Sequence, residues 1–291
     1  MTRPMLAHRR LALYLDLIRW KMPEGWYLLM WPGLSALWLA AGGFPGWRLM
    51  FVFAFGAFLM HAAGCCVNDV TDFKFDRHVK RTVGRVVASG SISRKEALLA
   101  GAAIALTAFA LALTLGQHAV MWSLACLGIT LFYPFTKRFF ALPQMVLGMA
   151  YSGAIIMAFA AVRDHVPPIA WLLWLGNIFW VMAFDTEYAM QDIQDDLKIG
   201  MKTTAITLGN NLIAGIIGFY IAYIAIWTLA LSLCGIHPIF YIAPVLALIQ
   251  TWWFWTQFRT RDEAKCFNAF LKNHWMGATF FFGIVAALLV A

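Results

Sequence analysis

Residues 68–76 read Asn68-Asp69-Val70-Thr71-Asp72-Phe73-Lys74-Phe75-Asp76, and they follow directly on the apolar run 48–67. A run of that length is typical of a membrane helix, because about 20 residues cross about 30 Å of hydrocarbon. Three carboxylates and an amide therefore gather where such a helix ends. If the helix continues to Asp76, then Asn68, Asp72 and Asp76 share one face at i, i+4 and i+8. Asp69 is then turned about 100° away from Asn68.

The whole chain has the composition of a polytopic membrane protein. Of its 291 residues, 62% are hydrophobic and only 12% are charged, about half the charged share of a soluble domain. We expect one all-α domain over residues 1–291, because backbone groups in lipid must pair within helices. Residues 1–21 predict an interfacial helix. Nine spans are predicted, at 25–41, 48–67, 96–115, 119–136, 143–162, 169–190, 211–233, 237–257 and 274–291.

The basic residues indicate the orientation in the membrane. With the N-terminus inside, only Arg48 and Arg163 of the 22 Lys and Arg residues lie outside. The positive-inside rule then predicts a cytoplasmic N-terminus and, after nine spans, a periplasmic C-terminus. The net charge of +8 is explained by this orientation, so nucleic-acid binding is not predicted. The five cysteines show neither a metal-site nor a disulfide spacing.

A second acidic cluster, residues 185–196, lies at the end of the predicted span 169–190. On a continuous helix, Asp185, Asp192 and Asp196 fall within about 20° of a common face. Both clusters lie on the predicted cytoplasmic side, where we expect segments 68–95 and 191–210 to form site loops. Carboxylate and amide oxygens without a Cys or His set suit Mg²⁺, which also accepts phosphate oxygens as ligands.

Cationic side chains accompany both clusters on the predicted cytoplasmic side. Acids for a metal and bases for phosphate predict a diphosphate site. The alternative is that both segments are solvated loops whose charges only pair with one another. Asp185 lies deeper than Asp192 and needs a cation or a polar partner, and Asn177 is expected to bond between helices. The neighbouring cations include Lys80, Arg81, Arg85, Lys137, Arg138 and Lys198.

Both clusters resemble the aspartate motifs of the UbiA family of intramembrane prenyltransferases. The first motif is Asn68-Asp69-x-x-Asp72-x-x-x-Asp76, followed by Lys80-Arg81-Thr82, and the second runs from Asp185 through Asp192-x-x-x-Asp196. Several further segments are similar to the branch of that family that prenylates 4-hydroxybenzoate in ubiquinone biosynthesis. Among them are Tyr133-Pro134-Phe135, Leu142-Pro143-Gln144 and Lys202-Thr203-Thr204. The loop Gly84-Arg85-Val86-Val87 departs from the family pattern, in which Pro follows Arg, and is expected to be more mobile.

The resemblance implies a nine-helix bundle in a bacterial inner membrane, with its active site facing the cytoplasm. It implies transfer of a polyprenyl group from a diphosphate donor to the ring carbon ortho to the hydroxyl of 4-hydroxybenzoate, with Mg²⁺ as cofactor. By this resemblance Mg²⁺ is held by Asn68, Asp72, Asp76, Asp192 and Asp196. The same four aspartates and Arg138 are expected to be catalytic. Contacts to the diphosphate are expected from Lys80, Arg81, Arg85, Lys137, Lys198 and Tyr188.

Two alternatives stay open at this point. One is an enzyme of the same family with another aromatic acceptor, namely dihydroxynaphthoate, homogentisate or haem. The other is a membrane carrier, although carriers usually place ionisable groups near the bilayer midplane. Neither the prenyl chain length nor the oligomeric state is predicted.

Overall fold

The computed structural model describes residues 3–291, with side chains from residue 10 onward, and over this range all regular structure is helical. Short 3-10 segments lie at Leu113–Leu115, Gly209–Asn211 and Pro238–Tyr241. The α-helices are α1 (Arg3–Leu17), α2 (Glu24–Ala41), α3 (Trp47–Thr71), α4 (Phe73–Asp76), α5 (Arg94–Ala112), α6 (Gln117–Thr136), α7 (Pro143–Tyr151), α8 (Gly153–Arg163), α9 (Pro168–Ala189), α10 (Ile193–Ile199), α11 (Thr204–Leu208), α12 (Leu212–Leu233), α13 (Ile242–Phe258), α14 (Glu263–Lys272) and α15 (His274–Val290).

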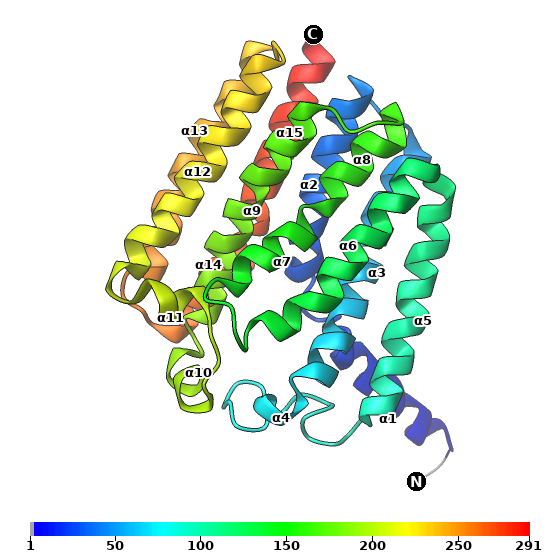
Figure 1. The fold of residues 1–291 in the computed structure, drawn as a ribbon, viewed down its shortest axis with the longest axis vertical. Helices are drawn as coiled ribbons and strands as arrows, with labels where there is room; N and C mark the ends of the chain where they lie inside the picture. The colour runs from blue at the N-terminus through cyan, green and yellow to red at the C-terminus, as the bar shows by residue number, and fades with distance from the viewer. Residues whose placement is uncertain (1–2) are drawn as a thin grey trace.

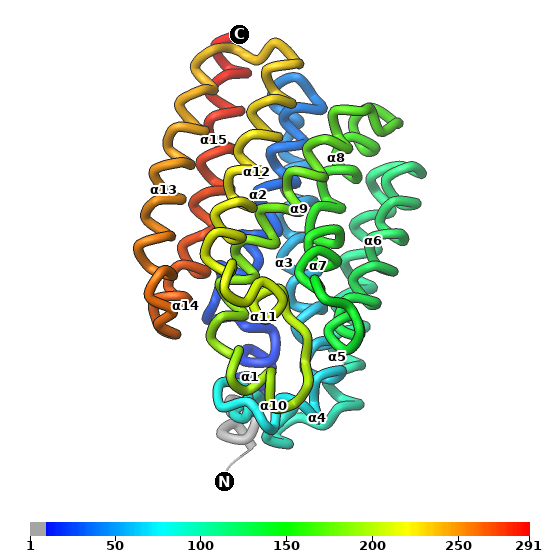
Figure 2. Tube along the Cα trace, turned by 60° about the vertical axis from the view of Figure 1, so that its left-hand side comes forward, coloured from blue at the N-terminus to red at the C-terminus, as the bar shows by residue number. Residues whose placement is uncertain are grey.

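The long helices form one bundle with two distinct ends. Figure 1 shows the short helices α4 and α10 below the bundle, at the end where α1 lies, while the C-terminus lies at the opposite end. The view in Figure 2 agrees with this arrangement. The two acidic clusters therefore meet at the same end of the bundle. The predicted site segments 68–95 and 191–210 are not plain loops, because they contain the short helices α4, α10 and α11.

Within residues 3–291, eight helical segments are long and apolar enough to cross a membrane. The predicted span 25–41 is helix α2, which is not among those eight. Glu24 and several tryptophans lower the hydropathy of α2, although much of the helix is buried. It packs against α3, α8 and α15, so its apolar side chains contact protein on several sides.

The predicted span 143–162 contains a break at Ser152, which separates α7 from α8. The Ser152 hydroxyl donates to the carbonyl oxygen of Gly148 at 2.6 Å. Asn177 of α9 in turn donates from Nδ2 to Ser152 Oγ at 2.9 Å. The predicted interhelical hydrogen bond of Asn177 is thus present, and it links α9 to the break between α7 and α8.

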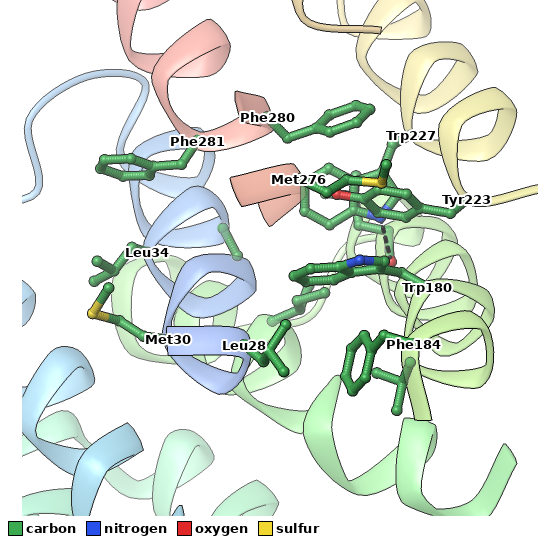
Figure 3. Close-up of a cluster of buried hydrophobic side chains, with 14 of the residues drawn as sticks. Leu28, Met30, Leu34, Trp180, Phe184, Tyr223, Trp227, Met276, Phe280 and Phe281 are labelled. Carbon is green, nitrogen blue, oxygen red and sulfur yellow. Dashed lines mark hydrogen bonds between the residues drawn. The ribbon is translucent and has the colours of Figure 1, made fainter. Parts of the chain in front are cut away.

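An aromatic cluster forms the core between α9, α12 and α15. Trp180 stacks on Tyr223 with ring centroids 5.5 Å apart, and Figure 3 shows both rings beside Trp227 and Met276. Gly277 of α15 allows this packing, because a Cβ atom there would lie 2.6 Å from Trp180 Cη2. Small residues at such crossings let membrane helices approach closely. This core holds α9, and with it the start of the second acidic motif.

Candidate active site

The first acidic motif spans the end of α3 and the start of α4. The chain bends at Asp72, whose φ and ψ are −90° and 4°, yet the helical register continues across the bend. The N–H of Asp72 donates to the carbonyl of Asn68, and the N–H of Asp76 donates to that of Asp72, both at 2.8 Å. Asn68, Asp72 and Asp76 therefore keep the predicted i, i+4 and i+8 relation.

The second motif has a similar local geometry. Asp192, with φ and ψ of −108° and 2°, precedes α10, and the N–H of Asp196 donates to its carbonyl at 2.8 Å. Gly200 ends α10 in the left-handed conformation, which favours glycine. Because α9 ends at Ala189, Asp185 does not share a continuous helix with Asp192. The continuous helix that was expected to place Asp185, Asp192 and Asp196 on one face is therefore interrupted, although all three side chains line the same cavity.

Both motifs open onto one cavity of about 420 Å³. Farther along the same cavity the wall is apolar, with side chains of α3, α5 and α6 such as Phe53, Leu111 and Leu127. Asp185 also lines it, with Gln144 and Lys137 as its polar neighbours, so the expected partners are present. The predicted site residues on the cavity wall are Asn68, Asp72, Asp76, Arg81, Arg85, Lys137, Tyr188, Asp192 and Asp196.

Several cavity carboxylates are paired with a cationic side chain. Lys137 Nζ lies 3.1 Å from Asp72 Oδ2, and Arg85 Nη1 lies 2.9 Å from Asp76 Oδ2. Arg81 forms an ion pair with Asp192 through Nη2. The charges therefore do pair, as the alternative interpretation of the sequence required, but they pair inside a shared cavity instead of in solvated loops.

Arg81 joins the two motifs directly. Its Nε lies 3.1 Å from both carboxylate oxygens of Asp192, and its Nη1 donates to the Tyr188 hydroxyl. Its guanidinium carbon also lies 4.5 Å from the centroid of the Tyr188 ring. Nearby, the backbone N–H of Lys80 donates to Asp195 at 3.1 Å and holds the pKa of that carboxyl below its usual value. These contacts join segments that lie far apart in the sequence, at the end of the cavity that carries both acidic motifs.

Some acceptor oxygens on the cavity wall have no hydrogen-bond or ion-pair partner among the described residues and could therefore bind a cation. Asn68 Oδ1 and Asp72 Oδ1 are buried without a hydrogen-bond partner. Asp196 takes no part in the ion pairs found among residues 10–291. Burial, and then the neighbouring Asp192, raises the pKa of Asp196 to about 7. Burial likewise raises the pKa of Asp76.

This donor set suits a hard divalent cation that is shared with a substrate. Among the side chains of residues 10–291, no three acidic, His or Cys groups converge into a preformed metal cage. Mg²⁺ is commonly bound by one or two carboxylates together with waters and substrate phosphates. Open oxygens from both motifs, with bases between them, match that mode of binding and not an all-protein cage.

Three predicted site residues lie off the cavity wall. Lys80 and Lys198 are exposed, and Lys198 Nζ donates to Asp195 at 3.1 Å. Arg138 Nη2 donates to the carbonyl of Thr71 at 3.4 Å, and its guanidinium lies 5.2 Å from the ring of Phe135. Their roles at the diphosphate, and the catalytic role of Arg138, stay predictions.

The structure adds Arg19 to the cavity, which sequence reasoning did not single out. Its Nη2 lies 2.6 Å from Asp69 Oδ1, so Asp69, which is turned away from the Asn68 face, has its own cationic partner. Arg85 Nη1 also lies 3.5 Å from Asp69 Oδ1. A sequence signal for Arg19 existed, because it is a basic residue near the end of the predicted interfacial helix, and Pro23 lies four residues farther along the chain. A second, adjoining cavity is also lined by Arg19, Arg81 and Arg85.

Comparisons with known proteins agree on one family. Residues 29–285 match the model of the UbiA prenyltransferase family. The chain is 55% identical to a 4-hydroxybenzoate octaprenyltransferase of Paracidovorax citrulli, over 95% of this chain and 94% of that protein. It is 56% identical to one of Polaromonas naphthalenivorans, over 96% of each chain.

Solved structures share the fold at lower sequence identity. An apo UbiA homologue from Aeropyrum pernix superimposes with a TM-score of 0.78 at 23% identity, over 91% of this chain and 98% of that one. A UbiA homologue from Archaeoglobus fulgidus, bound to GPP and Mg²⁺, superimposes with a TM-score of 0.72 at 17% identity, over 94% and 99% of the two chains.

Proposed function

The chain belongs to the UbiA prenyltransferase family, and from this premise we propose that it prenylates 4-hydroxybenzoate. The donor is a polyprenyl diphosphate, and the relatives' names favour an octaprenyl chain. The products are 3-polyprenyl-4-hydroxybenzoate and diphosphate, for ubiquinone biosynthesis. The near full-length identity to 4-hydroxybenzoate octaprenyltransferases favours this acceptor over dihydroxynaphthoate, homogentisate or haem.

One observation carries the assignment. A single cavity combines two acidic motifs and four cationic side chains at one end with an apolar wall farther along. A polyprenyl diphosphate has the same two parts, because its tail partitions into apolar surroundings at about 0.8 kcal/mol per CH₂ and its diphosphate needs charged partners. A carrier would need its ionisable groups near the middle of the bilayer, whereas both motifs lie at one end of the bundle (Figure 1).

The basic side chains on the wall act on the leaving group. Arg81, Arg85 and Lys137 bind the diphosphate and stabilise the negative charge that grows on it as the carbon–oxygen bond breaks. The electron-rich ring carbon ortho to the hydroxyl attacks the resulting allylic cation, and the ring then loses its proton. The apolar wall excludes water from that cation. Tyr188 keeps Arg81 in place through its hydroxyl and ring.

The carboxylates and the amide of the two motifs serve the metal. Mg²⁺ would be held by Asn68, Asp72 and Asp76 on one wall and by Asp192 and Asp196 on the other. When bound, Mg²⁺ neutralises diphosphate oxygens and so makes the diphosphate a better leaving group. The open oxygens Asn68 Oδ1 and Asp72 Oδ1 support this assignment, as does the Mg²⁺-bound state of the Archaeoglobus fulgidus homologue.

We further propose nine membrane spans, with α2 as the ninth beside the eight apolar segments. The N-terminus and the active site then face the cytoplasm of a bacterial inner membrane and the C-terminus faces the periplasm. The distribution of Lys and Arg supports this orientation. It also brings the acceptor and Mg²⁺, both water-soluble, to the end of the cavity that carries the charges.

The test is prenyl transfer by membranes that contain the protein. Membranes are incubated with octaprenyl diphosphate and 4-hydroxybenzoate in Mg²⁺, and prenylated product is measured by mass spectrometry. We expect product in Mg²⁺, none after EDTA, and restoration when Mg²⁺ is returned. Parallel reactions with dihydroxynaphthoate and homogentisate test the choice of acceptor.

A matched pair of variants tests the site. Asp72→Asn should abolish transfer. Asp164→Asn should not, because Asp164 lies at the far end of the bundle, at the C-terminus of α8, and accepts from His118 at 2.8 Å. No product from 4-hydroxybenzoate in Mg²⁺, with product from another acceptor, would refute the proposed substrate. Full activity of Asp72→Asn would refute the metal assignment.

A further inference from the structure

Glu187 is an acidic residue of α9 that the proposed reaction does not use. It lies between Thr186 and Tyr188, yet its side chain is fully buried and does not line the cavity. Its partners are Tyr220 of α12 and Asn273, which lies between α14 and α15. Among residues 10–291, no cation forms an ion pair with it.

The orientation of the Asn273 amide is fixed by its neighbours. Asn273 Nδ2 donates to Glu187 Oε2 at 2.9 Å and to the carbonyl of Ala269 at 3.0 Å. Asn273 Oδ1 accepts from Trp180 Nε1 at 3.2 Å. The reverse orientation would place two donors against each other at Trp180 and two acceptors against each other at Ala269. Both amide hydrogens of Asn273 are therefore already used.

The Tyr220 hydroxyl makes two short oxygen–oxygen contacts but carries only one hydrogen. Its oxygen lies 2.7 Å from Glu187 Oε1 and 2.7 Å from Asn273 Oδ1. Each of these oxygen–oxygen contacts needs a hydrogen, and a tyrosine hydroxyl supplies only one. Asn273 Oδ1 has none to give. The second hydrogen can come only from the carboxyl group of Glu187.

We infer that Glu187 is held as a neutral carboxylic acid, which donates its proton to Tyr220 while Tyr220 donates to Asn273. Burying an ionised carboxylate with no cation beside it costs free energy, whereas burying a neutral carboxyl group whose polar atoms are all hydrogen-bonded avoids that cost. The resulting chain of bonds fixes the last turn of α9 against α12 and α15. Tyr188, the next residue, is in contact with Arg81, so Glu187 is a positioning residue for the diphosphate end of the cavity.

Infrared spectroscopy of the purified protein tests the protonation directly. The spectrum of wild type minus that of Glu187→Gln should contain the carbonyl band of a protonated carboxyl group. Tyr220→Phe removes the hydroxyl but keeps the ring that stacks on Phe254, and it should shift this band to higher frequency because the bond from Glu187 is lost. Absence of a protonated-carboxyl band from the difference spectrum would overturn the inference.

Rescue by the conservative variant tests the positioning role, which rests on the proposed prenyl transfer. Glu187→Gln can donate to Tyr220 and accept from Asn273, so kcat and the KM for the donor should stay within about twofold of wild type. Glu187→Leu should lower kcat or raise the donor KM. If Glu187→Leu does not fold, Tyr220→Phe serves in its place. Equal damage by Gln and Leu would overturn the neutral network, whereas inactivity of wild type would refute the proposed function and leave the infrared result unaffected.

Discussion

Variants of Lys137 should separate an effect on the stability of the protein from an effect on prenyl transfer. Its Nζ lies 3.1 Å from Asp72 Oδ2, and 19% of the Lys137 side chain and 6% of the Asp72 side chain are exposed. At an effective dielectric constant of about 20 the attraction across 3.1 Å is about 5 kcal/mol. Desolvation of both groups offsets part of that attraction. Lys137→Met should therefore lower the free energy of unfolding by about 3 kcal/mol, the low end of the range for breaking a buried pair.

The double variant Lys137→Met with Asp72→Asn removes both charges. It should recover most of the lost stability, because no unpaired charge is left buried. Prenyl transfer should fall by about 100-fold or more in Lys137→Met and should not recover in the double variant, since a donor to the leaving diphosphate is lost. Lys137→Arg, which keeps the charge, is the control for stability.

Two measurements decide this prediction, namely denaturant unfolding in detergent micelles and product formation in membranes. A double variant as unstable as Lys137→Met would show that the ion pair with Asp72 does not account for the loss. Wild-type activity of Lys137→Met would show that this lysine does not act on the diphosphate.

Two further predictions concern the metal and the packing. Because burial raises the pKa of Asp196 to about 7, protons compete with the metal as pH falls through 7. The Mg²⁺ concentration for half-maximal activity should then rise, and an unchanged requirement would exclude Asp196 as a ligand. Gly277→Ala should destabilise the protein by about 1–3 kcal/mol, since the new Cβ would lie 2.6 Å from Trp180. Gly218→Ala in α12 is the control in the same unfolding assay, because a Cβ atom added there would have no neighbour within 4 Å. Equal stability of the two variants would refute the packing argument.

The sequence predicted the helices and both motifs because each leaves a local pattern. Apolar runs of about 20 residues are typical of spans, and the spacing of Asn68, Asp72 and Asp76 follows from helical geometry alone. The structure keeps that register even though α3 ends before Asp76. It also places both motifs on one cavity, as the shared side of their loops had indicated.

The features that were missed depend on tertiary contacts. The end of α9 at Ala189 separates Asp185 from Asp192, and nothing in the sequence there resembles a helix stop such as Gly or Pro. Glu187 was counted with the acidic cluster, although two residues after Asp185 a helix has turned by about 200° and points the side chain to the opposite face. The partners of Glu187 come from α12 and Asn273, which no local pattern could predict.

The charges on the cavity wall set a condition on how the substrates enter. Six acidic and four cationic side chains line the cavity, so its formal charge is −2 when all are ionised. A diphosphate that entered alone would add its negative charge to a cavity that is already negatively charged. The low dielectric constant there strengthens the repulsion between the diphosphate and the carboxylates of the wall. One divalent ion cancels the charge of the wall. Donor binding and metal binding should therefore be thermodynamically coupled, with each strengthening the other by the same factor.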